Sequence, residues 1–374
     1  MNQEQRKFPC VFMRGGTSKA IFFRKDVLPK DEREWPEIFL KVMGTPDVKQ
    51  IDGMGGATSS TSKVAVISKS SRPGVDVDYH FYQVDILIPR ADDSANCGNI
   101  SSAVGPYAID EGMVEAVEPI TVVRLYNTNT GKIIEEHVRV KDGKACVNGD
   151  TSIQGVPGTG SKIDMFFEDP AGSKTGKLFP TGNKKETLDV PGYGAAEVTL
   201  LDCSNPVVFI KASDLGIQGT ELTELNSNQN VMEHIERIRG LAAVKMGFVS
   251  DYRKARTEST SAPKVAIISP AQDYKNMDGN LVKKNDMDLC VRAVSVGMLH
   301  KAYPMTVAVA TGAAAKLPGT IVADLLGEKE SDTIRLGHSS GVTAVTMKMD
   351  GGKVLQGGVV RTARRIMDGF VYIR

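Results

Sequence analysis

The chain has 374 residues, of which 41% are hydrophobic and 24% charged, and its formal net charge is +1 at pH 7. The 46 basic and 45 acidic residues leave no excess of positive charge, which argues against a nucleic-acid-binding protein and against a membrane-surface protein with a basic face. No apolar run approaches about 20 residues, so we expect no membrane span. The polar start MNQEQRKFPC lacks the apolar segment of a secretory signal, and five scattered cysteines without a CxxC pair fit the reducing cytoplasm.

Strand patterns dominate the chain. Residues 75–88 alternate apolar and polar side chains, with a phase slip near Tyr82 that is typical of a bulge. Asp142-Gly143 between short apolar runs predicts a hairpin, and Asp350-Gly351 predicts a second one near the C-terminus. Further strands are expected at residues 20–23, 64–67, 120–126, 198–201, 207–210, 265–268 and 370–373.

Helical patterns are fewer. Apolar residues recur at helical spacing over residues 231–241, where Gly240 or Gly247 would end the helix, and a second helix is expected from residue 286 to about 301. Residues 98–109 and 311–326 contain small side chains and almost no charge, as expected of helices that are buried on all sides. Two buried helices among many strands predict an α+β fold of two similar halves, each a sheet wrapped around one helix.

A short internal repeat also indicates two halves. Residues 60–68 and 261–269 share the pattern S-x-x-K-V-A-x-I-S at an offset of 201 residues (261 minus 60), and each copy is followed by one of the two predicted buried helices. We therefore expect an N-terminal domain of residues 1–190 and a C-terminal domain of residues 191–374. The Gly/Pro/Lys-rich stretch 157–194 would connect them, and the last strand can pack back on the N-terminal domain.

The 37 glycines gather at predicted strand ends and helix starts. Free backbone N–H groups at a helix N-terminus attract anions, and the helix dipole adds to that attraction. The starts at Gly98 and Gly312 thus predict two places that bind carboxylates, one in each half, facing each other across a cleft.

Cofactor and metal sites are not expected. Residues 155–162 (GVPGTGSK) nearly match a phosphate-binding loop, but Ser-Lys stands where that motif needs Lys followed by Ser or Thr. No GxGxxG follows a strand, and the five histidines are isolated without HExxH spacing.

Cys97 and Lys63 are the candidate acid–base residues. Cys97 stands at a predicted helix start, where the dipole lowers a thiol pKa, although most free cysteines are simply small buried residues. Lys63 follows a Gly-rich turn and enters an apolar strand, where desolvation would make its neutral amine available as a base. The alternative for Lys63 is a solvent-facing lysine at a strand edge.

Several motifs together resemble the PrpF-type isomerases: MRGGTSK at 13–19, TSK at 61–63, NCGNISSAVG at 96–105, NTNTGK at 127–132, GH at 337–338 and RTARRIM at 361–367. This family includes methylaconitate isomerases, methylitaconate delta-isomerases and oxalomesaconate tautomerases, and belongs to the diaminopimelate-epimerase-like superfamily. The resemblance implies two similar domains, each a curved sheet around a central helix, with the active site in the cleft between them. It also implies a cofactor-independent 1,3-allylic proton shift in a small unsaturated di- or tricarboxylate, with Lys63 and Cys97 at the positions of the family's functional lysine and cysteine.

Amino-acid racemases and epimerases of the same superfamily use two opposed cysteines, one at the start of each central helix. Here the expected second helix start, residues 309–312, contains no thiol, which disfavours a racemase. A non-catalytic accessory protein that binds tricarboxylates is a second alternative, and a homodimer is the ordinary expectation for the assembly.

The reaction would begin at Lys63, and either Cys97 or Lys63 would return the proton. Arg14 has the charge to bind a carboxylate but is equally well interpreted as a surface residue. The expected substrate-binding residues are Thr17, Ser18, Ser62, Asn96, Gly98, Asn99, Thr311, Gly312, His338 and Ser339.

Overall fold

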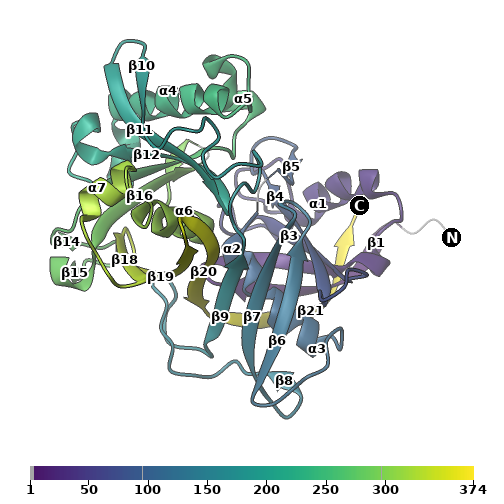
Figure 1. The fold of residues 1–374 in the computed structure, drawn as a ribbon. Helices are drawn as coiled ribbons and strands as arrows, with labels where there is room; N and C mark the ends of the chain where they lie inside the picture. Colours follow the sequence, from purple (N-terminus) through teal and green to yellow (C-terminus); the bar gives the residue numbers. More distant parts are fainter. Residues whose placement is uncertain (1–3, 95, 296) are drawn as a thin grey trace. The chain divides into compact units, whose positions relative to one another are not determined.

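The computed structural model describes residues 4–94, 96–295 and 297–374. Contacts divide the chain into two compact units: unit 1 comprises Met1–Met165 and Val360–Arg374, and unit 2 comprises Phe166–Val359 (Figure 1). This division falls after Met165 instead of after residue 190, and the last strand belongs to unit 1. Residues 157–194 contain two strands, β9 (Ile163–Glu168) and β10 (Glu186–Val190), so that stretch is not simply a linker.

The main strands of unit 1 pair in the order β21–β1–β2–β3–β4–β6–β7. They are β1 (Arg6–Gly15), β2 (Ser18–Arg24), β3 (Lys63–Lys69), β4 (Val77–Val84), β6 (Ile120–Asn127), β7 (Lys132–Lys141) and β21 (Ala363–Ile373). The pairs β2–β3 and β4–β6 are parallel and therefore need crossover connections. Helix α1 (Trp35–Met43) lies in the first crossover, and α2 (Gly98–Ser101) and α3 (Val104–Asp110) lie in the second. Short strands β5 (Ala91–Asp92) and β8 (Lys144–Ala145) pair with β4 and β7.

The two faces of the unit 1 sheet pack against different helices. On one face, Phe39 of α1 stacks on Phe23 of β2, with ring centroids 5.9 Å apart. On the other face, the ring of Phe22 packs against that of Tyr107 of α3, with ring centroids 5.3 Å apart. Because successive side chains of a strand point to opposite faces, these two neighbours in β2 reach the two helical layers.

The main strands of unit 2 pair in the order β10–β11–β12–β13–β16–β18–β19–β20. They are β10, β11 (Gly194–Cys203), β12 (Asn205–Lys211), β13 (Lys264–Pro270), β16 (Leu289–Ser295), β18 (Thr333–His338), β19 (Gly341–Asp350) and β20 (Lys353–Arg361). The pairs β12–β13 and β16–β18 are parallel. Helix α4 (Gln229–Lys245) lies in the first crossover, followed by α5 (Ala255–Glu258); α6 (Met305–Ala315) and α7 (Ile321–Leu326) lie in the second. Three short strands, β14 (Tyr274–Lys275), β15 (Leu281–Val282) and β17 (Met298–Leu299), complete the unit, and Figure 1 shows α6 enclosed by its sheet.

The two units repeat one arrangement. The series β1–β2–β3–β4–β6–β7 has the same sequence of parallel and antiparallel pairs as β11–β12–β13–β16–β18–β19. The two copies of S-x-x-K-V-A-x-I-S lead into β3 and β13, the third strand of each series. The predicted α+β fold of two similar halves is confirmed.

The helix predicted at 286–301 is wrong, because this segment forms β16 and β17. Residues 289–294 are all buried, and β16 lies between β13 and β18. A central strand covered on both faces has apolar residues at almost every position, so its sequence lacks the alternation that marks a half-exposed strand.

The second buried helix starts earlier than predicted. Helix α6 begins at Met305, after Pro304, and its residues are buried on every side. Thr311 and Gly312 therefore lie inside the helix and not at its N-terminus, where free N–H groups would bind an anion. A Cβ at Gly312 would lie 2.8 Å from the sulfur of Met347, so this glycine permits close packing of α6 on β19. The first predicted start, at Gly98, is confirmed, although a turn separates α2 from α3.

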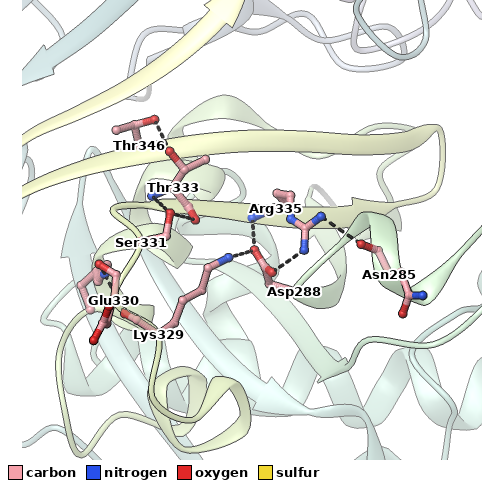
Figure 2. A network of polar contacts seen from close by, with 9 residues as sticks. Asn285, Asp288, Lys329, Glu330, Ser331, Thr333, Arg335 and Thr346 are labelled. Atoms are coloured by element: carbon pink, nitrogen blue, oxygen red, sulfur yellow. Dashed lines mark hydrogen bonds and ion pairs between the residues drawn. The ribbon is translucent and has the colours of Figure 1, made fainter.

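An ionic network ties β18 to the segment before β16 (Figure 2). Asp288 accepts hydrogen bonds from the backbone N of Arg335 at 2.7 Å and from its Nη2 at 2.9 Å, and forms an ion pair with Lys329. Burial by itself would raise the pKa of Asp288, but the hydrogen bonds from Arg335 and Lys329 lower it below its ordinary value. The network thereby fixes the segment that connects α7 to β18.

Candidate active site

Lys63 is the first residue of β3, and only 7% of it is exposed. Its Nζ donates to Oε1 of Gln83 at 2.5 Å and lies 5.0 Å from the centre of the Phe81 ring. Gln83 is the cross-strand neighbour of Lys63 on β4, and its Nε2 donates to the carbonyl oxygens of Ser59 and Ser62. The amide of Gln83 is thus held with its oxygen toward the lysine.

Burial lowers the pKa of Lys63, and this shift is opposed by the charge and the hydrogen bond of Cys97. The two predicted acid–base residues therefore interact. Because only 7% of Lys63 is exposed, the solvent-facing alternative is wrong. A buried lysine with a lowered pKa supplies more neutral amine at neutral pH than an exposed lysine does.

Cys97 is the residue that precedes α2, and its backbone is extended (φ −119°, ψ 96°). Its carbonyl oxygen accepts from the backbone N and the hydroxyl of Ser101, at 2.9 and 3.1 Å. The side chain is half-buried, whereas Cys10, Cys203 and Cys290 are buried. Burial raises the pKa of Cys10 to about 11, so its thiolate is scarce at neutral pH.

The β1–β2 turn is fastened to α2. Asn99 donates from Nδ2 to the hydroxyl of Thr17 at 3.0 Å. Gly16 has a φ of +50°, and a Cβ there would lie 2.2 Å from Oδ1 of Asn99, so only glycine fits. Ser18, the first residue of β2, is buried and pairs with Gly15. The structure therefore brings Thr17 and Ser18 of the β1–β2 turn close to Asn99, which follows Gly98 at the start of α2.

Ser62 and Asn96 are already engaged by other side chains. The hydroxyl of Ser62 accepts from Nε2 of Gln50 at 2.7 Å. Oδ1 of Asn96 accepts from Nδ2 of Asn127 at 3.2 Å, so the NTNTGK turn supports the loop that leads to Cys97.

Arg361 is a feature of this site that the sequence analysis missed. It is 7% exposed, and its Nη1 donates to the carbonyl oxygen of Val360, while Nε has no partner among the described residues. Burial lowers its pKa to about 9, and no carboxylate in the described part of the chain pairs with it. Its Cδ would lie 3.2 Å from a Cβ at Gly16, beside Asn99. The motif RTARRIM contains three arginines, and the sequence alone does not distinguish the buried one.

In unit 2, the start of α6 is fastened to a hairpin turn much as α2 is in unit 1. Asn205, at the β11–β12 turn, donates from Nδ2 to the hydroxyl of Thr306 at 3.2 Å. Neither residue was predicted, because the misassigned helix at 286–301 moved the expected helix start to Thr311. Thr311 instead lies within α6, where its hydroxyl donates to the carbonyl oxygen of Val307 and bonds the Tyr303 hydroxyl, so the helix start expected there is wrong. Gly312 also lies within α6, where it packs on β19, and not at a helix start.

His338 and Ser339 lie at the β18–β19 turn in unit 2, and both are buried. Nδ1 of His338 accepts from the backbone N of Ser340 at 3.2 Å, so the neutral ring carries its proton on Nε2. The hydroxyl of Ser340 donates to the carbonyl oxygen of Lys301, in the segment that precedes α6. This turn therefore adjoins the approach to the α6 N-terminus.

The described residues contain no group of three or more His, Cys, Asp or Glu side chains placed to hold a metal ion. Among the helices of residues 4–94, 96–295 and 297–374, none is long and apolar enough to cross a membrane.

Residues 5–374 match the PrpF protein family. The chain belongs to the PrpF family. It is 44% identical over 373 residues to 3-methylitaconate isomerase of Eubacterium barkeri, covering 99% of this chain and 98% of that protein. It is 40% identical to 2-methyl-aconitate isomerase of Shewanella oneidensis, covering 99% and 97% of the two chains. The (4E)-oxalomesaconate Delta-isomerase of Novosphingobium sp. is 39% identical, with 98% and 97% covered.

Solved structures agree with this assignment. A crystal structure of methylitaconate-delta-isomerase superposes with a TM-score of 0.85 at 44% identity, covering 99% of this chain and 96% of that one. A hydroxyproline epimerase from Agrobacterium vitis is similar in fold, with a TM-score of 0.58 at 12% identity, covering 100% of this chain and 94% of the other. The PrpF-family chain is an isomerase with the diaminopimelate-epimerase-like fold.

Proposed function

We propose that this PrpF-family isomerase moves a proton between two carbons of a small unsaturated di- or tricarboxylate and thereby shifts the double bond. The burial of Lys63, whose Nζ donates to the neutral amide of Gln83, is the observation that carries the proposal. Methylitaconate, methylaconitate and oxalomesaconate, the acids in the names of the relatives, belong to this substrate class. Which of them this chain takes is decided by side chains that contact the substrate.

Lys63, as the neutral amine, removes a proton from the carbon next to the double bond. The electron pair of the broken C–H bond delocalises over the allylic system and the adjoining carboxylate. Cys97, or the lysine that has just been protonated, then delivers a proton to the far carbon of that system. If Cys97 delivers it, the Lys63 ammonium gives its proton to the Cys97 thiolate, and both groups return to their starting state. The substrate gains and loses one proton, so neither an oxidant nor a cofactor is needed. Acid–base groups placed in this way typically contribute about 10²–10⁴-fold to the rate.

Arg361 and the β1–β2 turn would hold the substrate carboxylates. A buried guanidinium without a carboxylate partner is costly, and an anionic substrate would supply the missing charge. Gly16 lies between Arg361 and Asn99, and Asn99 bonds the hydroxyl of Thr17 in the same turn. The backbone N–H groups at Gly98 and Asn99 start a helix. A donor aimed at the charge that develops in the transition state is worth roughly 3–4 kcal/mol.

His338 and Ser339 in unit 2 are proposed as further carboxylate-binding residues, and Thr306 at the α6 start takes the place that Thr311 held in the sequence-based hypothesis. The α6 start reads Tyr303-Pro304-Met305-Thr306 and contains no thiol. A two-cysteine racemase is therefore not favoured.

The decisive experiment follows proton exchange by NMR with a panel of unsaturated carboxylates in D₂O. Wild-type enzyme is expected to shift the double bond of at least one acid and to introduce solvent deuterium. Lys63→Ala should lower kcat/KM by about 10²-fold or more. The matched control is Lys264→Ala, at the repeat-related position in β13, which should keep the wild-type rate. If Lys63→Ala keeps more than roughly a tenth of the wild-type rate, Lys63 is not the base.

Cys97→Ser separates two roles for the thiol. A loss as large as that of Lys63→Ala is expected if the thiol returns the proton. A loss of only a few-fold would mean that Lys63 both removes and returns it, and that Cys97 helps to orient the lysine. The same NMR measurement distinguishes these outcomes.

A homodimer in the cytoplasm is also part of this proposal. All five cysteines are free, as expected of a protein in a reducing compartment. Size-exclusion chromatography with light scattering tests the dimer, and a monomer at micromolar concentration would contradict it.

A further inference from the structure

Three cations lie side by side on one face of the unit 1 sheet. Arg14 of β1 is paired directly with Lys19 of β2 and with Arg364 of β21. Directly paired residues point to the same face of a sheet, and like charges in such pairs are destabilising. Burial, together with the charge of Arg364, lowers the pKa of Arg14.

In the described part of the chain, these three cations have no carboxylate partner. The Arg14 guanidinium donates to the carbonyl oxygens of Gly16 and Thr362, at 3.0 and 2.8 Å. Nζ of Lys19 lies 5.5 Å from the centre of the Phe12 ring. The repulsion within the row is therefore not relieved by any acidic side chain that the structure describes.

The same three side chains line a pocket of about 390 Å³ within unit 1. Its volume falls in the range of about 300–1,000 Å³ that is usual for small-molecule sites. Thr151, Thr159 and Thr362 also line it, and the loop that contains the GVPGTGSK sequence forms a wall. The apolar side chains of Ile153, Val156 and Ile366 complete the lining.

The pocket is separate from the candidate active site. A Cβ at Gly15 would lie 2.4 Å from the carbonyl oxygen of Asn99, so this position of β1 faces α2. Side chains alternate along a strand, and Arg14 therefore points to the opposite face, away from α2. Neither Lys63 nor Cys97 lines the pocket.

We propose that the pocket lined by Arg14, Lys19 and Arg364 is a second binding site, for a small organic anion with two or more negative charges. Guanidinium groups bind carboxylate and phosphate oxygens with paired hydrogen bonds, and the threonine hydroxyls supply further donors. The apolar wall fits the carbon skeleton of such a ligand. Phosphoryl and carboxylate groups share this chemistry, and the proposal holds independently of the reaction at Lys63.

The test measures binding by isothermal titration calorimetry with two separate probes: inorganic pyrophosphate for the phosphoryl class, and tricarballylate, a saturated tricarboxylate, for the carboxylate class. At least one probe is expected to bind wild-type protein. Arg364→Gln and Arg364→Glu should weaken that binding by about tenfold or more, since each removes a charged donor. Arg364 is exposed, and melting curves will establish that both variants are folded.

Lys69→Glu is the matched control, because Lys69 is an exposed cation on the same sheet that does not line the pocket. Its affinity for the probe should equal that of wild type. The proposal is overturned if neither probe binds at millimolar concentration, or if Arg364→Glu binds as tightly as wild type. It is also overturned if Lys69→Glu loses as much affinity as Arg364→Glu, since binding would then follow the general charge of the protein. If the carboxylate probe bound only at the active site, Arg364→Glu would bind it as tightly as wild type does, and the proposal would be overturned.

Discussion

The acceptor beside Lys63 is a neutral amide. The cross-strand pairing of β3 with β4 places Gln83 opposite the lysine, and two backbone carbonyl oxygens fix the direction of its amide. A carboxylate at this position would stabilise the ammonium form, whereas the amide orients Nζ without adding charge. Gln83 is thus a positioning residue for the proposed base.

Gln83→Glu should move the acidic limb of the pH profile of kcat/KM to higher pH. The new carboxylate raises the pKa of Lys63, and the neutral amine that the reaction needs then forms only at higher pH. The measurement is kcat/KM from pH 5 to 10, with Gln218→Glu as a control on an exposed residue. An unchanged limb would mean that titration of Lys63 does not set the pH dependence.

Arg361→Met should separate substrate binding from stability. The variant removes a buried guanidinium that has no carboxylate partner, so the free energy of unfolding is expected to stay the same or to rise. If Arg361 binds a substrate carboxylate, KM should rise roughly ten- to a hundredfold, the value of a charge-assisted hydrogen bond. Urea unfolding and steady-state kinetics measure the two effects. Loss of stability with unchanged KM would show that the arginine is only structural.

At the scale of elements, the packing of α6 on β19 requires glycine at position 312. Gly312 allows the helix to approach β19, and a Cβ there would lie 2.8 Å from Sδ of Met347 and 2.9 Å from Cγ1 of Val345. Valine is stiff about its first side-chain torsion, so the neighbours give way only in part.

Gly312→Ala should therefore destabilise the protein by about 1–3 kcal/mol, as overpacking does. Helix propensity alone predicts the opposite, a gain of about 1 kcal/mol for replacing glycine by alanine inside a helix. Urea unfolding decides between the two. A stabilised variant would contradict the packing role that the structure gives to this glycine.

At the scale of the whole molecule, a buried carboxyl group links stability to pH. Oε2 of Glu136 on β7 accepts from the backbone N of Gly105 at 2.8 Å, while Oε1 has no partner among the described residues. Burial raises the pKa of Glu136 to about 8, although the hydrogen bond from Gly105 lowers it. The folded protein thus keeps a proton that the unfolded chain loses above its ordinary pKa of 4.5.

Stability should accordingly fall as the pH rises from about 5 to 8, with a slope of at most about 1.4 kcal/mol per pH unit from this group. Glu136→Gln should remove this slope and make the protein more stable than wild type near pH 8. Urea unfolding at pH 5, 6.5 and 8 measures the effect, with Glu115→Gln, at an exposed position, as the control. A wild-type slope that survives in Glu136→Gln would rule out this carboxyl group as its source.

The sequence predicted much of the fold because its signals are local. Alternating strands, Asp-Gly turns and the repeat at residues 60–68 and 261–269 each depend on a few neighbouring residues. The same locality explains the errors. Residues 289–294 do not show by themselves that they pair with β13 on one side and β18 on the other, so their almost continuous apolar pattern predicts a helix where the structure has a buried strand. That error also moves the expected start of α6 to Thr311.

The sequence by itself determined the family, the two similar halves, and the candidates Lys63 and Cys97. Motifs and repeats are patterns of residues close together in the chain, so they can be recognised without the fold. Only the tertiary structure decided that Lys63 is buried beside Cys97 and that Arg361 lies near Gly16 without a carboxylate partner among the described residues. It also assigned Gly312 to packing and aligned Arg14, Lys19 and Arg364 across three strands. Burial, pairing and like-charge contacts arise between residues far apart in the chain, and they shift pKa values and create binding sites only when the chain is folded.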